Sequence, residues 1–244
     1  MNITPLTHAA PEAATSSWQR RTLAAIIAAL AIIGISVLVG SQLPDATNVD
    51  GRLSRWFVDH RTPTWNSISG FFSEMASTMV VVGIAAAVVL VEAVRRRWDA
   101  VRLLVTAMTG EVLIFLSITA LVDRPRPDVA HLDSAPPTSS FPSGHTLATF
   151  VLWTAVAVVA TVHVWPLVLR LFTRLLAVLM PAAVALSRVY RGMHHPTDVT
   201  ASVVIGVIWM SVVVFLFTPR PERQLLHETA NGKFPNKRWS NRNV

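Results

Sequence analysis

Residues 187–219 have the sequence SRVYRGMHHPTDVTASVVIGVIWMSVVVFLFTP, in which a crowded polar segment leads directly into an uncharged one. The polar part, residues 187–198, contains a serine, two arginines, two adjacent histidines and an aspartate. The part that follows is long enough to cross the hydrocarbon core of a bilayer as a helix, which takes about 20 apolar residues. The segment therefore predicts a membrane-spanning helix with reactive side chains at one end.

The composition of the whole chain agrees with a membrane protein. Of its 244 residues, 52% are hydrophobic and 14% are charged, and the mean hydropathy is +0.49. Soluble domains usually carry about 25% charged residues. The net charge of +7 does not indicate a nucleic-acid partner, because the basic residues fall in short clusters between apolar runs and form no basic face. The sequence has no cysteine, which excludes disulfides, thiolate catalysis and zinc–thiolate sites.

Six apolar runs are candidates for membrane-spanning helices. The fifth run contains Arg174, whose long side chain can reach the membrane interface, and Pro181, which kinks a helix. The first run could also be a signal peptide, but it is longer than the usual cleaved core, so a retained anchor is favoured. The six predicted spans are residues 22–41, 75–91, 103–122, 146–169, 169–187 and 199–219.

These runs predict an all-α, polytopic membrane protein in which six transmembrane helices form one bundle. The membrane domain covers residues 22–219, between a flexible N-terminus at 1–21 and a basic tail at 220–244. Of the basic residues, 14 lie on the side of the two termini and 7 on the other side, and the richer side is the cytoplasmic one. We therefore expect a plasma-membrane protein of bacterial type with cytoplasmic termini. Residues 50–63 carry apolar side chains at helical spacing and predict an interfacial helix on the outer surface.

Three polar segments fall on the same, extracytoplasmic side of the predicted bundle: DRPRPD at 123–128, SFPSGHT at 140–146, and residues 187–198. Arg126 lies between two prolines that restrict its backbone, and Arg188 lies at the outer end of the fifth span. Two arginines that converge on one point can bind a tetrahedral oxyanion through charge-assisted hydrogen bonds. The sequence therefore predicts an anion site on this side of the membrane.

The residues at the start of the fourth span fit the same anion site. Ser143, Gly144 and His145 open this span, and a helix N-terminus offers unpaired N–H groups and the positive end of a dipole. Gly144 lets an anion approach the backbone closely, and His145 would stand beside that anion as a proton donor. Each polar segment taken alone is also typical of a stiff turn, a helix cap or a hydrated loop. Their presence on one side of the membrane favours a functional site.

The two adjacent histidines differ in their spacing to Asp198. His194 precedes Asp198 by four residues, so it could donate a ring N–H to the carboxylate and keep its other nitrogen as a nucleophile. His195 directly precedes Pro196, which pushes its backbone toward extended geometry. The spacing favours His194, but the proline disturbs ideal helical geometry and leaves His195 open.

These motifs resemble those of the type-2 phosphatidic acid phosphatase superfamily, which includes bacterial acid phosphatases and vanadium haloperoxidases. That family has three motifs: Lys-x6-Arg-Pro, Pro-Ser-Gly-His and Ser-Arg-x5-His-x3-Asp. The second motif is present at residues 142–145, and the third is complete from Ser187 to Asp198. In the third motif, His194 takes the position of the family nucleophile and His195 falls on an unspecified position.

The first motif of the family is only partial in this chain. Arg126 and Pro127 match it, but Thr119 stands at the position of the lysine. Arg124, two residues before Arg126, is a candidate to supply the missing positive charge to the phosphate, because an alternating extended backbone sends both side chains to one side.

The resemblance implies a metal-independent enzyme without a cofactor that hydrolyses a phosphoric monoester or diphosphate through a phosphohistidine. It implies the catalytic residues His194 as nucleophile, Asp198 as the group that orients it, and His145 as general acid and base. It implies that the phosphate is held by Arg126, Arg188, Ser143 and Gly144, with Arg124 as an additional candidate.

A site at the outer surface suggests an amphiphilic substrate that enters from the leaflet: a polyprenyl diphosphate, phosphatidic acid or phosphatidylglycerophosphate. Two alternatives remain, a phosphotransferase with an acceptor other than water and a catalytically weak lipid-binding scaffold. Glu111 is the charged residue within the third predicted span. A carboxylate at that depth is expected to face the bundle interior or a wet cavity, where it either fixes helix packing or takes part in substrate or proton handling.

Overall fold

The computed structural model describes residues 12–43, 48–135 and 137–217, and within them the chain forms eight helices and no strand. The all-α class predicted from the sequence is therefore confirmed. The predicted tail at 220–244 lies outside the described residues, as do residues 1–11 of the predicted N-terminus. The helices are α1 (Glu12–Gln42), α2 (Asn48–Asp59), α3 (Pro63–Met75), α4 (Thr78–Val94), α5 (Trp98–Leu121), α6 (Gly144–Val162), α7 (Leu167–Tyr190) and α8 (Pro196–Phe217).

Within the described residues, five helices are long and apolar enough to cross a membrane on their own: α1, α5, α6, α7 and α8. The pair of α3 and α4 passes the same test as a unit, although the two helices meet at an angle of 47°. Counted in this way, the structure has the six spans that the sequence predicts. Several borders differ from the predicted ones; for example, α6 ends at Val162, while the sequence predicts the fourth span up to residue 169. Helix α7 begins shortly afterwards at Leu167, directly after its N-cap residue Pro166.

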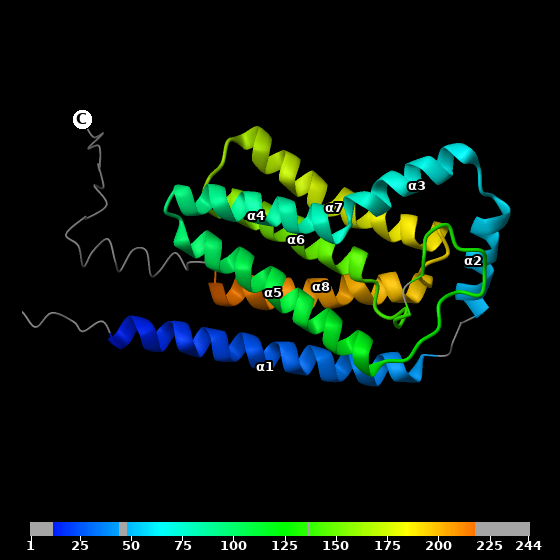
Figure 1. Ribbon diagram of the computed structural model, residues 1–244. Coiled ribbons are helices and arrows are strands. Elements are labelled where there is room, and N and C mark those ends of the chain that lie inside the picture. The colour runs from blue at the N-terminus through cyan, green and yellow to red at the C-terminus, as the bar shows by residue number, and fades with distance from the viewer. Residues whose placement is uncertain (1–11, 44–47, 136, 218–244) are drawn as a thin grey trace, which may run out of the picture.

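The long helices run side by side, with α6 in the middle of the bundle (Figure 1). It contacts α4, α5, α7 and α8, and half of its most apolar stretch is buried inside the protein. By contrast, α7 exposes large apolar side chains such as Leu171, Phe172 and Val178. An apolar surface on a helix of this length is suited to lipid, so the protein is an integral membrane protein.

A close contact between α5 and α8 shows how tightly the bundle is packed. The ring of Trp209 lies over Gly110, where an added Cβ would come within 2.0 Å of a ring atom. The indole Nε1 of Trp209 donates a hydrogen bond of 2.9 Å to the carbonyl of Ala107, which satisfies its polar group inside an apolar core. A side chain at position 110 would therefore push α8 away from α5.

Two shorter helices, α2 and α3, gather with the loop 122–143 at one end of the bundle, on the right in Figure 1. Helix α2 matches the interfacial helix predicted at residues 50–63, whereas the sequence does not predict α3. Pro63 takes the first position of α3, and the hydroxyl of Thr62 accepts a hydrogen bond of 3.2 Å from the backbone N–H of Trp65. This end of the bundle, here called the site end, is where all three polar segments of the sequence meet.

Candidate active site

Five of the predicted site residues line one cavity of about 750 Å³ at the site end, and four of them bring ionisable side chains to it. These four are Arg126 from the loop after α5, His145 from the start of α6, Arg188 from the end of α7 and His194 from the turn before α8. From these polar groups the cavity continues between α4 and α5, where its wall is apolar. The cavity therefore has one charged end and one apolar end.

The two arginines of the cavity are held by neighbouring oxygen atoms. Arg126 donates a hydrogen bond of 2.7 Å from Nη1 to the carbonyl of Met193. Arg188 is buried and donates from its Nη1 to the hydroxyl of Ser73, also at 2.7 Å. Burial lowers the pKa of Arg126, which remains a cation at any ordinary pH. Two desolvated guanidinium groups facing one cavity form a strong site for an oxyanion.

Asp133, in the loop before α6, joins Arg188 in the last turn of α7 to Arg191, which follows that helix. Its carboxylate accepts hydrogen bonds from Arg188 at 2.9 Å and from Nε of Arg191 at 2.8 Å. Burial alone would raise the pKa of Asp133, but the hydrogen bonds and charges of Arg191 and Arg188 outweigh it and lower this pKa. The carboxylate is therefore ionised and fixes the direction of the Arg188 side chain. No sequence motif marks Asp133.

The N-terminus of α6 opens into the same cavity. Gly144 is its first residue, and the side chain of the N-cap residue Ser143 makes no capping hydrogen bond. An added Cβ on Gly144 would lie 2.8 Å from the ring of Phe115, so only a glycine fits this close approach. The first N–H groups of a helix have no partner within the helix, and here they lie beside His145 in the cavity wall.

Ser143 itself does not line the cavity. Its backbone N–H donates a hydrogen bond of 2.8 Å to the hydroxyl of Ser202, and its own hydroxyl accepts one of 3.0 Å from Thr146. The residue is fully buried. The phosphate contact predicted for the Ser143 side chain is therefore not supported by its position, and these contacts instead tie the start of α6 to α8.

A glycine turn after α7 brings His194 to the cavity. Gly192 has a φ of 75°, and the N–H of Met193 donates to the carbonyl of Arg188 at 3.0 Å. The N–H of Gly192 donates to the carbonyl of Val189, also at 3.0 Å. This pair of hydrogen bonds is the Schellman ending of a helix, which needs a residue in the left-handed region. With this turn between them, Arg188 and His194 both line the large cavity.

His194 is held in one tautomer. Its Nδ1 lies 2.7 Å from the carbonyl oxygen of Ser140, which can only accept, so Nδ1 carries the proton and Nε2 keeps a lone pair when the ring is neutral. Burial lowers the pKa of His194 well below its usual value near 6.5, and the charges of Arg188 and Arg126 lower this pKa further. The ring is therefore neutral near pH 7, as a nitrogen nucleophile must be.

Asp198 lies close to His194 but is not its hydrogen-bond partner. The nearest carboxylate oxygen is 3.9 Å from Nδ1, which is already bonded to Ser140. The carboxylate of Asp198 instead accepts a hydrogen bond of 2.8 Å from the backbone N–H of His195. Because α8 begins at Pro196, His195 is its N-cap residue and Asp198 is its third residue. In a capping box, the side chain of the third residue accepts a hydrogen bond from the backbone N–H of the N-cap residue, as Asp198 does here. The hydrogen bond between His194 and Asp198 that the spacing predicts is therefore absent. His194 is bonded to Ser140 instead, and Asp198 is bonded to the N–H of His195.

His195 points away from the cavity. Its ring is buried, and its Nε2 lies 3.3 Å from the carbonyl of Pro125. It is not among the residues that line the cavity, whereas His194 is. The spacing in the sequence does not decide which histidine faces the site, and in the structure it is His194 that lines the cavity.

Arg124, the additional candidate for phosphate binding in the sequence, does not lie at the cavity that Arg126 and Arg188 line. It is 2% exposed and does not line the cavity. Its guanidinium hydrogen-bonds to Asp198, to Asp50 of α2 at 3.1 Å and to the hydroxyl of Thr197 at 2.9 Å. The loop that carries Arg124 and Arg126 is not an alternating strand, so the two side chains diverge. At the position of the family lysine, Thr119 donates a long hydrogen bond of 3.5 Å to the carbonyl of Phe141.

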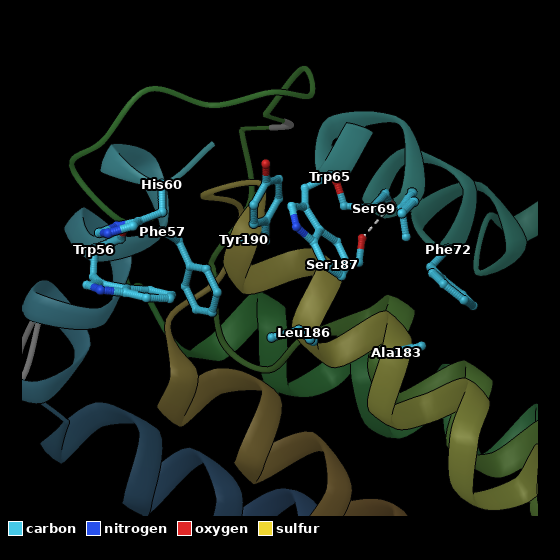
Figure 2. Close-up of a pocket in the computed structure, with 11 residues that line it drawn as sticks. Trp56, Phe57, His60, Trp65, Ser69, Phe72, Ala183, Leu186, Ser187 and Tyr190 are labelled. Carbon is cyan, nitrogen blue, oxygen red and sulfur yellow. Dashed lines mark hydrogen bonds between the residues drawn. The ribbon is translucent and has the colours of Figure 1, made fainter. Parts of the chain in front are cut away.

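A second cavity of about 340 Å³ lies between α2, α3 and α7 (Figure 2). It is lined by aromatic and apolar side chains, including Trp56, Trp65 and Tyr190. A hydrogen bond of 2.7 Å from the hydroxyl of Ser187 to the carbonyl of Ser69 closes the wall on the side of Arg188. Without a cationic side chain in its lining, this cavity is not suited to a phosphate.

The described part of the chain has no group of three or more His, Asp or Glu side chains placed to hold a metal ion. The groups in the large cavity are cations and imidazoles, which suit an anionic ligand.

Comparisons with known proteins agree with this geometry. The model of the PAP2 superfamily matches residues 100–222, which is half of the chain and includes every site residue predicted from the sequence, from Arg124 to Asp198. No curated protein matches the sequence.

Two solved structures have a similar fold. One is the PAP2-type phosphatidylglycerolphosphate phosphatase from Bacillus subtilis, with 22% identity, a TM-score of 0.62, and coverage of 76% of this chain and 93% of the other. The other is LpxE from Aquifex aeolicus, with 22% identity, a TM-score of 0.57, and coverage of 71% and 99%. At this identity the likeness establishes the fold.

Proposed function

Because the chain belongs to the PAP2 superfamily, we propose that it is a membrane phosphatase that removes the phosphate of a lipid phosphate or a prenyl diphosphate. The family predicted from the three motifs is confirmed by the match, and with it the class of enzyme, a phosphatase. The observation that carries the proposal for this chain is the cavity where Arg126, Arg188, His145 and the Nε2 side of His194 come together.

The proposed chemistry consists of two phosphoryl transfers. Nε2 of His194 attacks phosphorus, the bond from phosphorus to the leaving oxygen breaks, and His145 gives that oxygen a proton. Water then attacks the phosphohistidine while His145 takes a proton from it. The nitrogen–phosphorus bond breaks and releases inorganic phosphate. Arg126, Arg188 and the N–H groups at the start of α6 hold the phosphate oxygens, where electrostatic stabilisation does most of the work.

Asp198 supports His194 without a direct hydrogen bond in this proposal. The carbonyl of Ser140 fixes the ring, and the carboxylate at 3.9 Å stabilises the positive charge that the ring acquires when it is phosphorylated. The hydrogen bond from the N–H of His195 to Asp198 holds the carboxylate in place. Asp198 is thus a positioning and electrostatic residue beside the nucleophile.

The shape of the cavity supports a lipid substrate. Val82 on α4 and Val112 and Leu116 on α5 line it and are also exposed on the outside of the bundle. The cavity therefore opens sideways between α4 and α5, toward the surface that faces lipid. A phosphate could enter the charged end while its hydrocarbon chain stays in the bilayer. One structural neighbour acts on phosphatidylglycerophosphate, and a lipid of that kind is one of the candidate substrates here.

We place the site end on the extracytoplasmic side of a bacterial-type plasma membrane. The support is the excess of basic residues on the side of the two chain termini, which the positive-inside rule assigns to the cytoplasm.

The test is phosphate release by the purified protein from a panel of phosphatidic acid, phosphatidylglycerophosphate and a polyprenyl diphosphate, with and without a chelator. Turnover of at least one lipid that is insensitive to the chelator is expected. Transfer of phosphate to an added alcohol in preference to water would indicate a phosphotransferase with the same site. A folded protein that releases no phosphate from any of them would contradict the proposal and leave a lipid-binding role.

A further inference from the structure

Glu111 is a buried carboxylate that the proposed chemistry does not use. It lies in the middle of α5, is 3% exposed and lines the large cavity. Among the described residues, no side chain or backbone group donates a hydrogen bond or forms an ion pair with its carboxylate. A packing role through a bond to another helix therefore has no partner in the described part of the chain.

The other buried glutamate of the spans shows the contrast. Glu92, near the end of α4, is fully buried but lies 3.4 Å from Arg97 and 3.6 Å from Arg95. It follows the usual rule that a buried carboxylate has a cationic partner. Glu111 breaks this rule inside an apolar wall, where an unmatched acidic group is expensive and marks a functional site. The cavity is the place from which a partner can come.

The position of Glu111 defines where such a partner would be. Phe115, one helical turn nearer the site end on α5, packs against Gly144 at the start of α6. Four residues of helix rise by about 6 Å, so Glu111 lies roughly that far below the helix N-terminus that faces the phosphate. The lining residues that α4, α5 and α6 contribute along this stretch of the cavity include the apolar residues Val81, Met108, Val112 and Ala148. A ligand group that reaches Glu111 is therefore only a few bonds from the phosphorus atom.

We propose that Glu111 is a specificity residue that accepts a hydrogen bond from a hydroxyl or ammonium group of the substrate, a few bonds from its phosphate. This proposal rests on the proposed function and narrows its substrate class. Phosphates of hydroxylated glycerolipids and of amino alcohols have such a donor. Prenyl diphosphates have none, so their chain would leave Glu111 buried without a partner, which disfavours them.

The experiment uses two probes that differ at one position. Oleoyl lysophosphatidic acid has a hydroxyl on the central glycerol carbon, and its 2-O-methyl analogue has no donor there. The wild-type protein is expected to prefer the hydroxyl compound in kcat/KM by about tenfold or more, because the methyl analogue leaves a buried acceptor without its partner. In Glu111→Leu this preference should fall to about one. In Glu111→Gln, which keeps the shape of the side chain, it should fall to an intermediate value.

Two matched controls isolate the carboxylate. Glu92→Gln alters a buried glutamate outside the cavity, and Met108→Leu alters the cavity wall one turn from Glu111. Both should keep the preference of the wild type. A preference below twofold in the wild type, or one that Glu111→Leu retains, would overturn the proposal.

Binding separates this inference from the proposed function. The phosphonate forms of the two probes cannot be hydrolysed, and the rise in unfolding temperature that each causes reports binding alone. If no lipid phosphate is hydrolysed but the hydroxyl phosphonate still stabilises the wild type more than Glu111→Leu, the phosphatase proposal fails and the role of Glu111 stands. If both phosphonates stabilise the wild type equally, Glu111 is not a specificity residue.

Discussion

The guanidinium of Arg124 hydrogen-bonds to the carboxylate of Asp198 in the interior of the protein, outside the phosphate cavity. A second nitrogen of the same guanidinium lies 3.1 Å from Asp50, so one buried cation serves two buried carboxylates. Asp50 also accepts a hydrogen bond of 2.8 Å from Thr197 at the start of α8. Helix α2 is thereby fixed to the residue that stands beside His194, the proposed nucleophile.

Arg124→Ala should reduce both stability and turnover. Removing one partner from a buried ion pair costs about 3–5 kcal/mol, because the carboxylates that remain are buried without a cation. Since Arg124 does not reach the cavity, Thr119→Lys should not rescue the loss. Unfolding temperature and turnover of the wild type, both single variants and the double variant provide the measurement. Arg55→Ala, an exposed arginine of α2, is the control and should behave as wild type. Rescue by Thr119→Lys would instead assign Arg124 to phosphate binding.

His194→Ala should abolish turnover, whereas His195→Ala should retain most of it. Of the two adjacent histidines, His194 lines the cavity, whereas His195 does not and is directed toward the carbonyl of Pro125. Phosphate release by the two variants is compared after both have been shown to elute as folded protein. Equal losses in two folded variants would mean that the nucleophile is assigned wrongly.

The pH dependence should show that His194 is neutral well into the acidic range. Burial and two neighbouring cations lower its pKa below 6.5, and the nucleophile is lost only when pH falls through that lowered value. The acid limb of kcat/KM that belongs to His194 should therefore lie below pH 6.5. Arg188→Gln removes a positive charge and makes protonation easier, so it should move this limb to higher pH. The same substrate is used for both proteins, which cancels its own titration, and an unshifted limb would contradict the assignment.

His145→Gln should slow poor leaving groups more than good ones. A general acid typically contributes about 100- to 10,000-fold, but an aryl oxygen leaves with little help from a proton. The expected result is a large loss with an alkyl phosphate and a much smaller one with p-nitrophenyl phosphate. Equal losses with the two substrates would remove His145 from the role of acid.

The orientation can be measured with reporters. A phosphatase or fluorescent reporter fused at the C-terminus should read as cytoplasmic, and one inserted near Ala130 should read as external. The expectation follows from the distribution of 14 and 7 basic residues on the two sides. The reversed result would place the cavity on the cytoplasmic leaflet.

The membrane fold and the composition of the site could be predicted because both are local properties of the sequence. An uncharged run of about 20 residues indicates a span wherever it occurs. Because the chain changes sides of the membrane at each span, every second loop then lies on the same side. Helix starts also carry their own signals, as at Gly144 and Pro196. The break between α3 and α4 lacks such a signal, since neither proline nor glycine stands at residues 76–77.

Hydrogen-bond partners could not be predicted because they come from distant segments. The acceptor for His194 is Ser140, which lies 54 residues earlier, and the partner of Arg188 is Asp133, 55 residues earlier. The i,i+4 spacing correctly indicates that Asp198 is near His194, but a carbonyl from another loop takes the ring N–H first. Likewise, no local pattern links Asp50 to Thr197, because the two residues are 147 positions apart in the sequence.

The bend between α3 and α4 has a consequence for the membrane itself. Helix α4 has 17 residues, so it spans about 25 Å, less than the roughly 30 Å of a typical hydrocarbon core. A short hydrophobic segment is accommodated by local thinning of the bilayer. We therefore expect a thinner bilayer beside α4, which forms one edge of the proposed sideways opening. Under the proposed function, such thinning would bring the phosphate of a lipid closer to the arginines while its chains remain in the leaflet.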